Sequence, residues 1–540
     1  MRFCFQLIFV LGGSCLLLTS GCGSDTGGDA AITPNDAGIL RRGNGGDPET
    51  LDPSRAESIH AFNVLRDLYE GLVTEGPDGT LMPGAASAWE VSADGRVYTF
   101  HLRDKVKWSN GMPVTAGEFV ASFRRTLAPE SQSAYAFLLD PIKNSAAVAS
   151  GRMPPAELGV RAVDRLTLQI ELAAPAGYFP GILAMPIAFP LFGEEAFDPR
   201  QFGDPSSFVG NGPYVLRSRD PDARIRLERN PRFRESGQVQ MRFVDYYPIA
   251  DAQAEFSMYR AGELDITATV PPAQIANLRR TRADELRISP SLGLYYIAFD
   301  LKEPRLDDRR LRQALSMAID RETLADIVGR GEQAAYGIVP DGVMRYRPAR
   351  YAWQSVSRQA RESRARALYK DAGFGDASAL ALTLMYDAGD IHETVALTVT
   401  AMWRDVLGVE THLDKREWKY FLDTRSNRED WQLMRFVWIG DYNDANTFLD
   451  IFRSGSTQNL PGYNDREYDE LLAAAAATLD ETARAALLQQ AEMRVLGAYP
   501  IVPLYFFVNK HLVKPSVRNF RSNVLDVHQS RYLELTSIVQ

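Results

Sequence analysis

The cysteines of this chain all lie near its N-terminus, at Cys4, Cys15 and Cys22, and residues 23–540 contain none. A fold built from that body cannot use disulfides, cysteine-ligated zinc, iron–sulfur clusters or a cysteine nucleophile. It must instead be stabilised by buried hydrophobic cores. With 45% hydrophobic and 24% charged residues in 540, the chain has the composition and length for roughly two to four globular domains.

The N-terminal segment has the pattern of a secretory signal peptide. Arg2 precedes an apolar stretch, residues 3–18, that is too short and too interrupted for a convincing membrane span. Residues 18–22 read Leu-Thr-Ser-Gly-Cys and resemble a bacterial lipobox, in which the cysteine is acylated and begins the mature protein. We therefore expect residues 1–21 to be removed and Cys22 to carry a lipid anchor. A plain cleaved signal peptide is the alternative.

Charge and motifs exclude several classes of function. The formal net charge of −9 provides no global basic field for nucleic acid. The sequence has no phosphate-binding loop, no HExxH, no CxxC and no GxSxG elbow, and its six histidines lack metal-ligand spacing, so a metal site would have to be assembled from distant segments. We expect no enzymatic activity, no cofactor and no metal. A hydrolase with a carboxylate pair is the remaining enzymatic alternative.

Hydrophobic periodicity predicts an α/β fold. Helical periodicity is plain over residues 308–328 and again over 471–495. Between them, strand and helix patterns alternate, which is typical of βαβ units with covered sheets. The expected elements are strand 381–386, helix 392–406, strand 409–413, helix 417–425 and strand 432–439.

A series of short motifs runs in fixed order along nearly the whole body. Together they resemble the extracellular solute-binding proteins of family 5, and within that family the oligopeptide-binding proteins of peptide ABC transporters. The motifs include RGNGGDPETLDP at 42–53, RDLYEGL at 66–72, KWSNG at 107–111, NGPY at 211–214, LERNP at 227–231, AIDR at 318–321, EWKYFLDTR at 417–425 and DYND at 441–444.

The resemblance implies a two-lobed clamp of the periplasmic-binding-protein type, with three domains, mixed sheets and a two-segment hinge near residues 292 and 508. Ligand would close such a clamp because it contacts both lobes. The expected division is a signal peptide at 1–21, a lipidated cysteine and flexible tether at 22–34, domain I at 35–69, 193–292 and 509–540, domain II at 70–192, and domain III at 293–508.

The resemblance also implies a function. The protein would be the substrate-binding receptor of an ABC importer, would capture sequence-tolerant peptides of roughly two to five residues as an added strand, and would deliver them to permease subunits. We expect a monomer, lipid-anchored on the periplasmic side of the cell envelope. The alternatives are a receptor for murein peptides or another solute on the same fold, or a peptide-binding surface chaperone or adhesin.

Several residues match the ligand contacts of the family. Asp441 matches the aspartate that receives the peptide α-ammonium, and Arg435 and His392 match residues that meet the carboxylate of longer peptides. From the residues alone, Asp441 could be a turn or helix-cap aspartate, Arg435 could pair with a protein acid, and His392 could be an exposed first-turn residue. Gly329 replaces the lysine that reaches very short peptides, and the adjacent Arg330 is the candidate substitute. The other matches are Tyr135, Tyr296, Trp418, Arg425 and Trp438 in the cleft, and Glu57, Ser58 and Ile59, whose backbone would pair with the ligand.

Overall fold

The structure is a computed structural model that describes residues 38–193, 199–375, 379–427 and 431–536. The expected signal peptide, the tether and the lipid on Cys22 lie outside the described residues. Within the described ranges, no helix is both long enough and apolar enough to cross a bilayer.

The first sheet joins segments that are far apart in the sequence. Its edge strand β1 pairs in parallel with β10, and the other neighbours pair antiparallel. In β9 the buried side chains alternate, so Ile225 and Leu227 face the core while Arg226 between them is more exposed. The strands in spatial order are β1 (Ile39–Gly43), β10 (Phe243–Tyr247), β9 (Arg224–Arg229) and β8 (Tyr214–Asp220).

The second sheet is antiparallel and packs against helix α2 (Ala116–Leu127). This helix begins at a capping box, in which Thr115 and Glu118 satisfy each other's backbone N–H groups. The Glu118 carboxylate also accepts a 2.8 Å hydrogen bond from the buried Trp108 indole, which fixes the start of the helix in the core. The strands are β4 (Ala86–Val91), β5 (Val97–Leu102), β7 (Thr167–Glu171) and β6 (Val160–Ala162).

The third sheet has six strands and mixes parallel with antiparallel pairing. It contains the predicted strand–helix alternation, and the predicted α/β fold with mixed sheets is confirmed. The alternating elements are β13 (Ala381–Asp387), α10 (Asp390–Leu407), β14 (Glu410–Arg416), α11 (Trp418–Asn427) and β15 (Leu433–Ile439). The sheet order is β12 (Gln333–Ala334), β16 (Ile501–Leu512), β11 (Leu286–Phe299), β15, β13 and β14.

Both regions predicted to be helical are helical, but the structure divides each of them. Each region is two helices, because an aspartate caps a new helix where the periodicity alone would continue the old one. Asp320 accepts from the Thr323 N–H at 3.2 Å, and Asp480 accepts from the Ala483 N–H at 2.8 Å. The resulting helices are α7 (Arg309–Met317) and α8 (Arg321–Val328), and α13 (Arg466–Ala477) and α14 (Glu481–Ala498).

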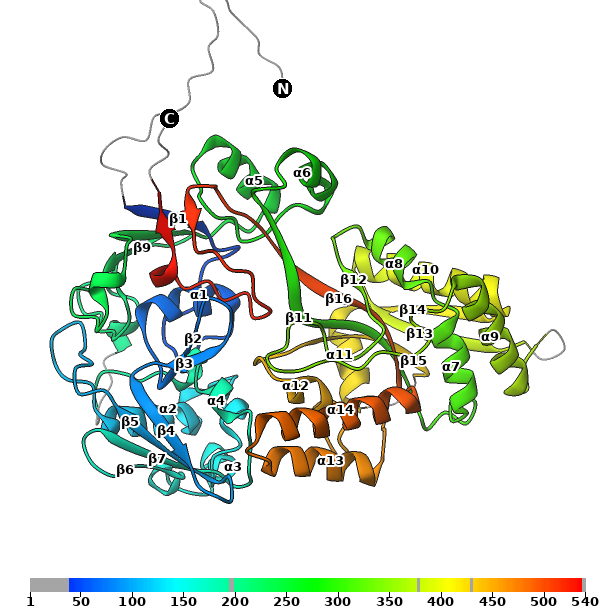
Figure 1. Cartoon of the computed structure of the whole chain (residues 1–540), viewed down its shortest axis with the longest axis horizontal. Coiled ribbons are helices and arrows are strands. Elements are labelled where there is room, and N and C mark those ends of the chain that lie inside the picture. Colours follow the sequence, from blue (N-terminus) through cyan, green and yellow to red (C-terminus); the bar gives the residue numbers. More distant parts are fainter. Residues whose placement is uncertain (1–37, 194–198, 376–378, 428–430, 537–540) are drawn as a thin grey trace, which may run out of the picture. The chain divides into compact units, whose positions relative to one another are not determined.

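Strands β11 and β16 form a long antiparallel ribbon (Figure 1). At one end the ribbon belongs to a large hydrophobic core built from residues between Leu292 and Val524. At the other end, Leu512 of β16 packs in a small cluster with side chains of α5 (Ala252–Ala261) and α6 (Ile275–Thr281). A second large core covers the first two sheets. The ribbon therefore connects separately packed cores, while the predicted domain boundaries stay a prediction.

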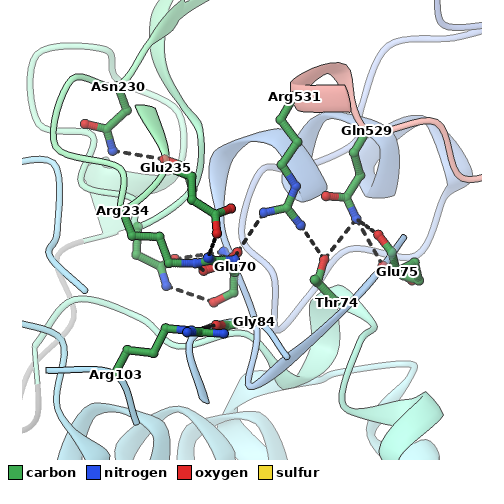
Figure 2. Close-up of polar contacts among 12 residues, drawn as sticks. Glu70, Thr74, Glu75, Gly84, Arg103, Asn230, Arg234, Glu235, Gln529 and Arg531 are labelled. Carbon is green, nitrogen blue, oxygen red and sulfur yellow. Dashed lines mark hydrogen bonds and ion pairs between the residues drawn. The ribbon is translucent and has the colours of Figure 1, made fainter. Parts of the chain in front are cut away.

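The last segment of the chain is fastened by buried charges to residues near its beginning (Figure 2). Arg531 donates to Glu70 at 2.7 Å and to Thr74 at 2.6 Å, and Arg234 donates to both oxygens of Glu70 at 3.0 Å. Glu70 is 2% exposed. Burial alone would raise the pKa of Glu70, but the two guanidinium groups hold that pKa below its ordinary value.

The other α-helices and two short strand pairs complete the fold. The helices are α1 (Ile59–Leu68), α3 (Ser145–Ala149), α4 (Phe179–Ile182), α9 (Arg358–Asp371) and α12 (Asn446–Leu449), and the strands pair as β2 (Val73–Glu75) with β3 (Leu81–Pro83) and β17 (Val517–Arg518) with β18 (Glu534–Leu535).

Candidate binding cleft

A cavity of about 910 Å³ is lined by two sets of residues that are distant in the sequence, one within 137–182 and the other within 425–476. The first set contributes to the core of the first two sheets and the second to the core of the six-stranded sheet. Three predicted site residues, Arg425, Trp438 and Asp441, line this cavity together. Trp438 lies near the end of β15, where burial along the strand decreases, and Asp441 follows two residues after that end.

Asp441 is a partly buried carboxylate for which no hydrogen bond or ion pair is found among the described residues. Its backbone N–H donates to Thr447 at 3.4 Å, but its side chain caps no described helix, since α12 begins after Ala445 without a side-chain cap. Burial raises its pKa from 3.8 to about 6. The carboxylate is therefore costly to ionise until a cation reaches it.

Tyr135 lies within electrostatic reach of Asp441. Burial raises the pKa of the Tyr135 hydroxyl, and the negative charges of Asp441, Glu57 and Glu49 raise it further. The Tyr135 ring also makes an edge contact with Phe62, with centroids 5.6 Å apart. The structure thus brings Tyr135, Asp441 and Glu57, all predicted from the sequence, into one neighbourhood.

In the segment from Glu57 to Ile59 the outer two residues are exposed and Ser58 is partly buried, but two of the segment's backbone N–H groups already donate hydrogen bonds. The Glu57 and Ser58 N–H groups donate to Glu49 Oε1 at 2.5 and 3.1 Å, and the Ser58 hydroxyl contacts the other oxygen of Glu49. Ser58 also caps α1 by accepting from the Ala61 N–H at 3.1 Å, and Ile59 is 48% exposed. Backbone pairing with a ligand stays a prediction, and it would require these two amides to leave Glu49.

Arg435 and His392 converge on a third side chain, Asp387. Arg435 forms a buried ion pair with Asp387, and His392 Nε2 lies 3.9 Å from the other oxygen of that carboxylate. His392 Nδ1 is 3.0 Å from the Tyr295 hydroxyl. Burial lowers the pKa of His392, and the charge of Arg330 lowers it further, so Arg330 is also within electrostatic reach. Arg435 has the protein acid that the sequence left open as its alternative partner, and its contact with a ligand stays a prediction.

Three predicted cleft residues are not on the cavity wall: Tyr135, described above, Tyr296 and Trp418. Tyr296 is 1% exposed in the core, because β11 is an interior strand paired on both sides, and its ring packs 5.5 Å from that of Phe436. Trp418 is 51% exposed at the start of α11, where it stacks on Phe421 with ring centroids 5.9 Å apart. Within this structure none of the three rings lines the cavity, so their cleft roles stay predictions.

The sequence missed residues whose importance depends on distant neighbours. Asp387 and Glu49 bind groups that were predicted to contact the ligand, namely the Arg435 guanidinium and the Glu57 backbone N–H. The Tyr178 and Tyr442 rings stack face to face at the cavity wall with centroids 5.1 Å apart. The sequence indicated one of these contacts only through Arg435, because a charge inside an apolar strand requires a partner. That signal does not say which acid supplies the partner.

Known bacterial binding proteins are similar to this chain over most of its length. The sequence model described as "Bacterial extracellular solute-binding proteins, family 5 Middle" matches residues 80–459. The periplasmic murein peptide-binding protein MppA of Escherichia coli (strain K12) is 34% identical over 489 residues, which cover 90% of this chain and 91% of MppA. The periplasmic oligopeptide-binding protein OppA of Salmonella typhimurium is 35% identical over 502 residues, covering 91% of each chain.

Among solved structures, the unliganded open form of the periplasmic murein tripeptide-binding protein MppA superposes with a TM-score of 0.86 at 33% identity. The superposition covers 93% of this chain and 98% of the other. This likeness confirms the predicted α/β fold of the periplasmic-binding-protein type.

Proposed function

The chain belongs to the bacterial extracellular solute-binding proteins of family 5, and from that premise we propose that it captures short oligopeptides and delivers them to the permease subunits of an ABC importer. The proposal includes a monomeric receptor, anchored by lipid on Cys22 on the periplasmic side of the envelope. Curated relatives named as periplasmic binding proteins for oligopeptides and murein peptides support it.

The observation that carries the proposal is the carboxylate of Asp441. It lines a cavity whose volume lies within the roughly 300–1,000 Å³ typical of small-ligand sites. An ammonium group is its chemical complement, because a charge-assisted hydrogen bond favours the ionised carboxylate that burial disfavours. Every free peptide has such a group at its N-terminus, so this contact selects for a peptide terminus and not for a sequence.

The cluster of Arg435, His392 and Asp387 is our candidate for the carboxylate end. A ligand carboxylate that displaces Asp387 from Arg435 would preserve the charge pairing of the buried guanidinium. Arg330, which already influences His392, adds a second cation for peptides of a different length. A receptor built this way selects peptides by the distance between their two termini, and therefore by their length.

Native mass spectrometry of the purified protein tests the function directly. We expect co-purified ligand masses that form a series of short peptides, since backbone and terminal contacts tolerate many side chains. Masses of murein peptides in place of that series would favour the second candidate, for which the similarity to the murein peptide-binding protein is the supporting observation. A single non-peptide mass would contradict both.

Peptide affinity is expected to depend on pH through Asp441. Because the ionised carboxylate binds the ammonium, affinity should fall about tenfold per pH unit below the pKa of about 6 and stay level just above it. The stability of the ligand-free protein should change with pH in the opposite direction to peptide affinity. Because the pKa of Asp441 in the folded state exceeds the ordinary 3.8, raising the pH from 3.8 through 6 lowers the free energy of unfolding by about 3 kcal/mol. Calorimetric titration across this pH range measures the peptide affinity. In the Asp441→Asn variant, the fall of affinity at acidic pH, the acid limb of the profile, should disappear. A variant that keeps the acid limb would assign it to another group.

A further inference from the structure

Three metal-ligating side chains meet outside the cleft, at the end of the ribbon. His511 lies on β16, one residue before that strand ends, while Asp526 and His528 lie on the C-terminal segment. Both imidazoles approach the same carboxylate oxygen: Asp526 Oδ1 lies 2.7 Å from His511 Nε2 and 3.1 Å from His528 Nε2. One ligand atom from each residue lies within 4.8 Å of the others.

The hydrogen bonds of His511 specify which of its nitrogens is free. Nδ1 lies 2.8 Å from the Thr267 carbonyl oxygen, which can only accept, so Nδ1 carries the hydrogen. In a neutral imidazole, Nε2 then holds a lone pair that faces the Asp526 carboxylate. A cation between the two removes that repulsion. A backbone carbonyl on the second nitrogen is also the usual support of a metal-bound histidine.

Neighbouring residues hold Asp526 and His528 in position on the C-terminal segment. The Asn523 side chain closes the turn from 523 to 527. It donates to the Val527 carbonyl at 2.9 Å and accepts from the Val527 N–H at 3.2 Å. Asp526 has a φ of 57°, a left-handed conformation that aspartate tolerates better than most residues. The His528 ring stacks on Phe520 at 4.0 Å, and its carbonyl accepts from Arg42 at 2.6 Å.

We propose that His511, Asp526 and His528 form a binding site for one divalent transition-metal ion, with Zn²⁺ as the best fit. Two imidazole nitrogens and one carboxylate oxygen favour zinc over calcium or magnesium, which prefer oxygen ligands alone.

The geometry needs little adjustment. Tetrahedral zinc with bonds of about 2.0–2.1 Å places its ligand atoms about 3.3 Å apart. Asp526 Oδ1, now 2.7 Å from His511 Nε2 and 3.1 Å from His528 Nε2, would move away from each by less than an ångström, and the two imidazole nitrogens already lie within 4.8 Å of one another. The Asp526 side chain is 29% exposed, which leaves access for the ion and for a water as fourth ligand. In the sequence these three residues have no recognisable metal-ligand spacing, which is why no metal was expected.

The bound ion would join β16 to the C-terminal segment that is itself fastened to Glu70 and Thr74. It would thereby brace one end of the ribbon that connects the separately packed cores. This role is independent of the proposed ligand of the cleft.

The test is zinc binding to the purified, chelator-treated protein by calorimetry at neutral pH. We expect one zinc per chain and a rise in the unfolding temperature when zinc is added. The variant His528→Gln should lose at least about 100-fold in zinc affinity, since loss of outer-shell support alone costs about 10–100-fold. His101→Gln is the matched control. His101 also lies near a carboxylate, 3.7 Å from Glu90, but its side chain is 44% exposed and is distant in the sequence from the proposed site. This substitution should leave zinc binding unchanged.

Substitution with Co²⁺ in the wild-type protein provides a readout that does not depend on how the variant folds. A tetrahedral site should produce visible absorption at one equivalent of cobalt. Equal zinc affinity in the wild type and in His528→Gln would overturn the site. So would the absence of zinc binding and cobalt absorption, and in that case a second proton on His511 would satisfy Asp526.

Discussion

Replacing Asp441 by alanine is expected to weaken the binding of peptides with a free α-ammonium by about 2–5 kcal/mol, the usual result of removing one partner from a desolvated charge pair. Most of that loss reflects the ligand ammonium, which would enter the cavity without a counter-charge. Calorimetric titration of one peptide in its free and N-acetylated forms measures the effect. Asp441→Ala should affect only the free form.

Asp140 offers a matched control for this experiment. It lines the same cavity, and burial also raises its pKa. If Asp441 acts by direct contact, Asp140→Ala should change the affinity little, whereas a general electrostatic effect of the cavity would make the two variants similar. Equal affinity of the wild type for free and N-acetylated peptides would refute the ammonium assignment.

The Glu70→Ala variant is expected to lower the free energy of unfolding by about 3–5 kcal/mol, because it leaves two guanidinium groups without their shared carboxylate. Arg531 is 7% exposed and Arg234 is also largely buried, so both charges would stay in a poorly solvated environment. Urea denaturation, followed by circular dichroism, measures the change. The Glu70 variant should unfold at lower urea with a similar dependence on denaturant.

Glu171→Ala is the matched control for stability. Glu171 pairs with Lys143 at 2.8 Å, but its side chain is 48% exposed, and such surface pairs contribute about 0–1 kcal/mol. Comparable destabilisation by the two substitutions would show that burial of the Glu70 network is not what matters.

The sequence predicted most reliably what depends on local spacing. The alternation of strands and helices from β13 to β15 appears within a few residues of its expected bounds, because each element buries one face and its period is visible in the chain. Where two helices follow one another, the apolar period hides the boundary. The capping aspartates, Asp320 and Asp480, then decide where the second helix begins.

The candidate site was predictable only in part, and for a different reason. Asp441 was identified by resemblance, and its position on the cavity wall could not come from periodicity. Glu49 and Asp387 were missed because their roles depend on which groups the fold places beside them, as with the Arg435 pair across 48 residues. Tyr296 shows the reverse: it matches a cleft position by resemblance, yet its strand lies inside the sheet.

The pairing of Glu70 with Arg531 spans 461 residues, nearly the whole chain. Such a contact can form only after the C-terminal residues have been synthesised, so Glu70 cannot reach its final environment during translation. Closing so long a loop is entropically costly, which places this contact late in the order of assembly. A chain that ended before residue 531 would lack this cation, so the buried charge network beside the core of the first two sheets would stay incomplete.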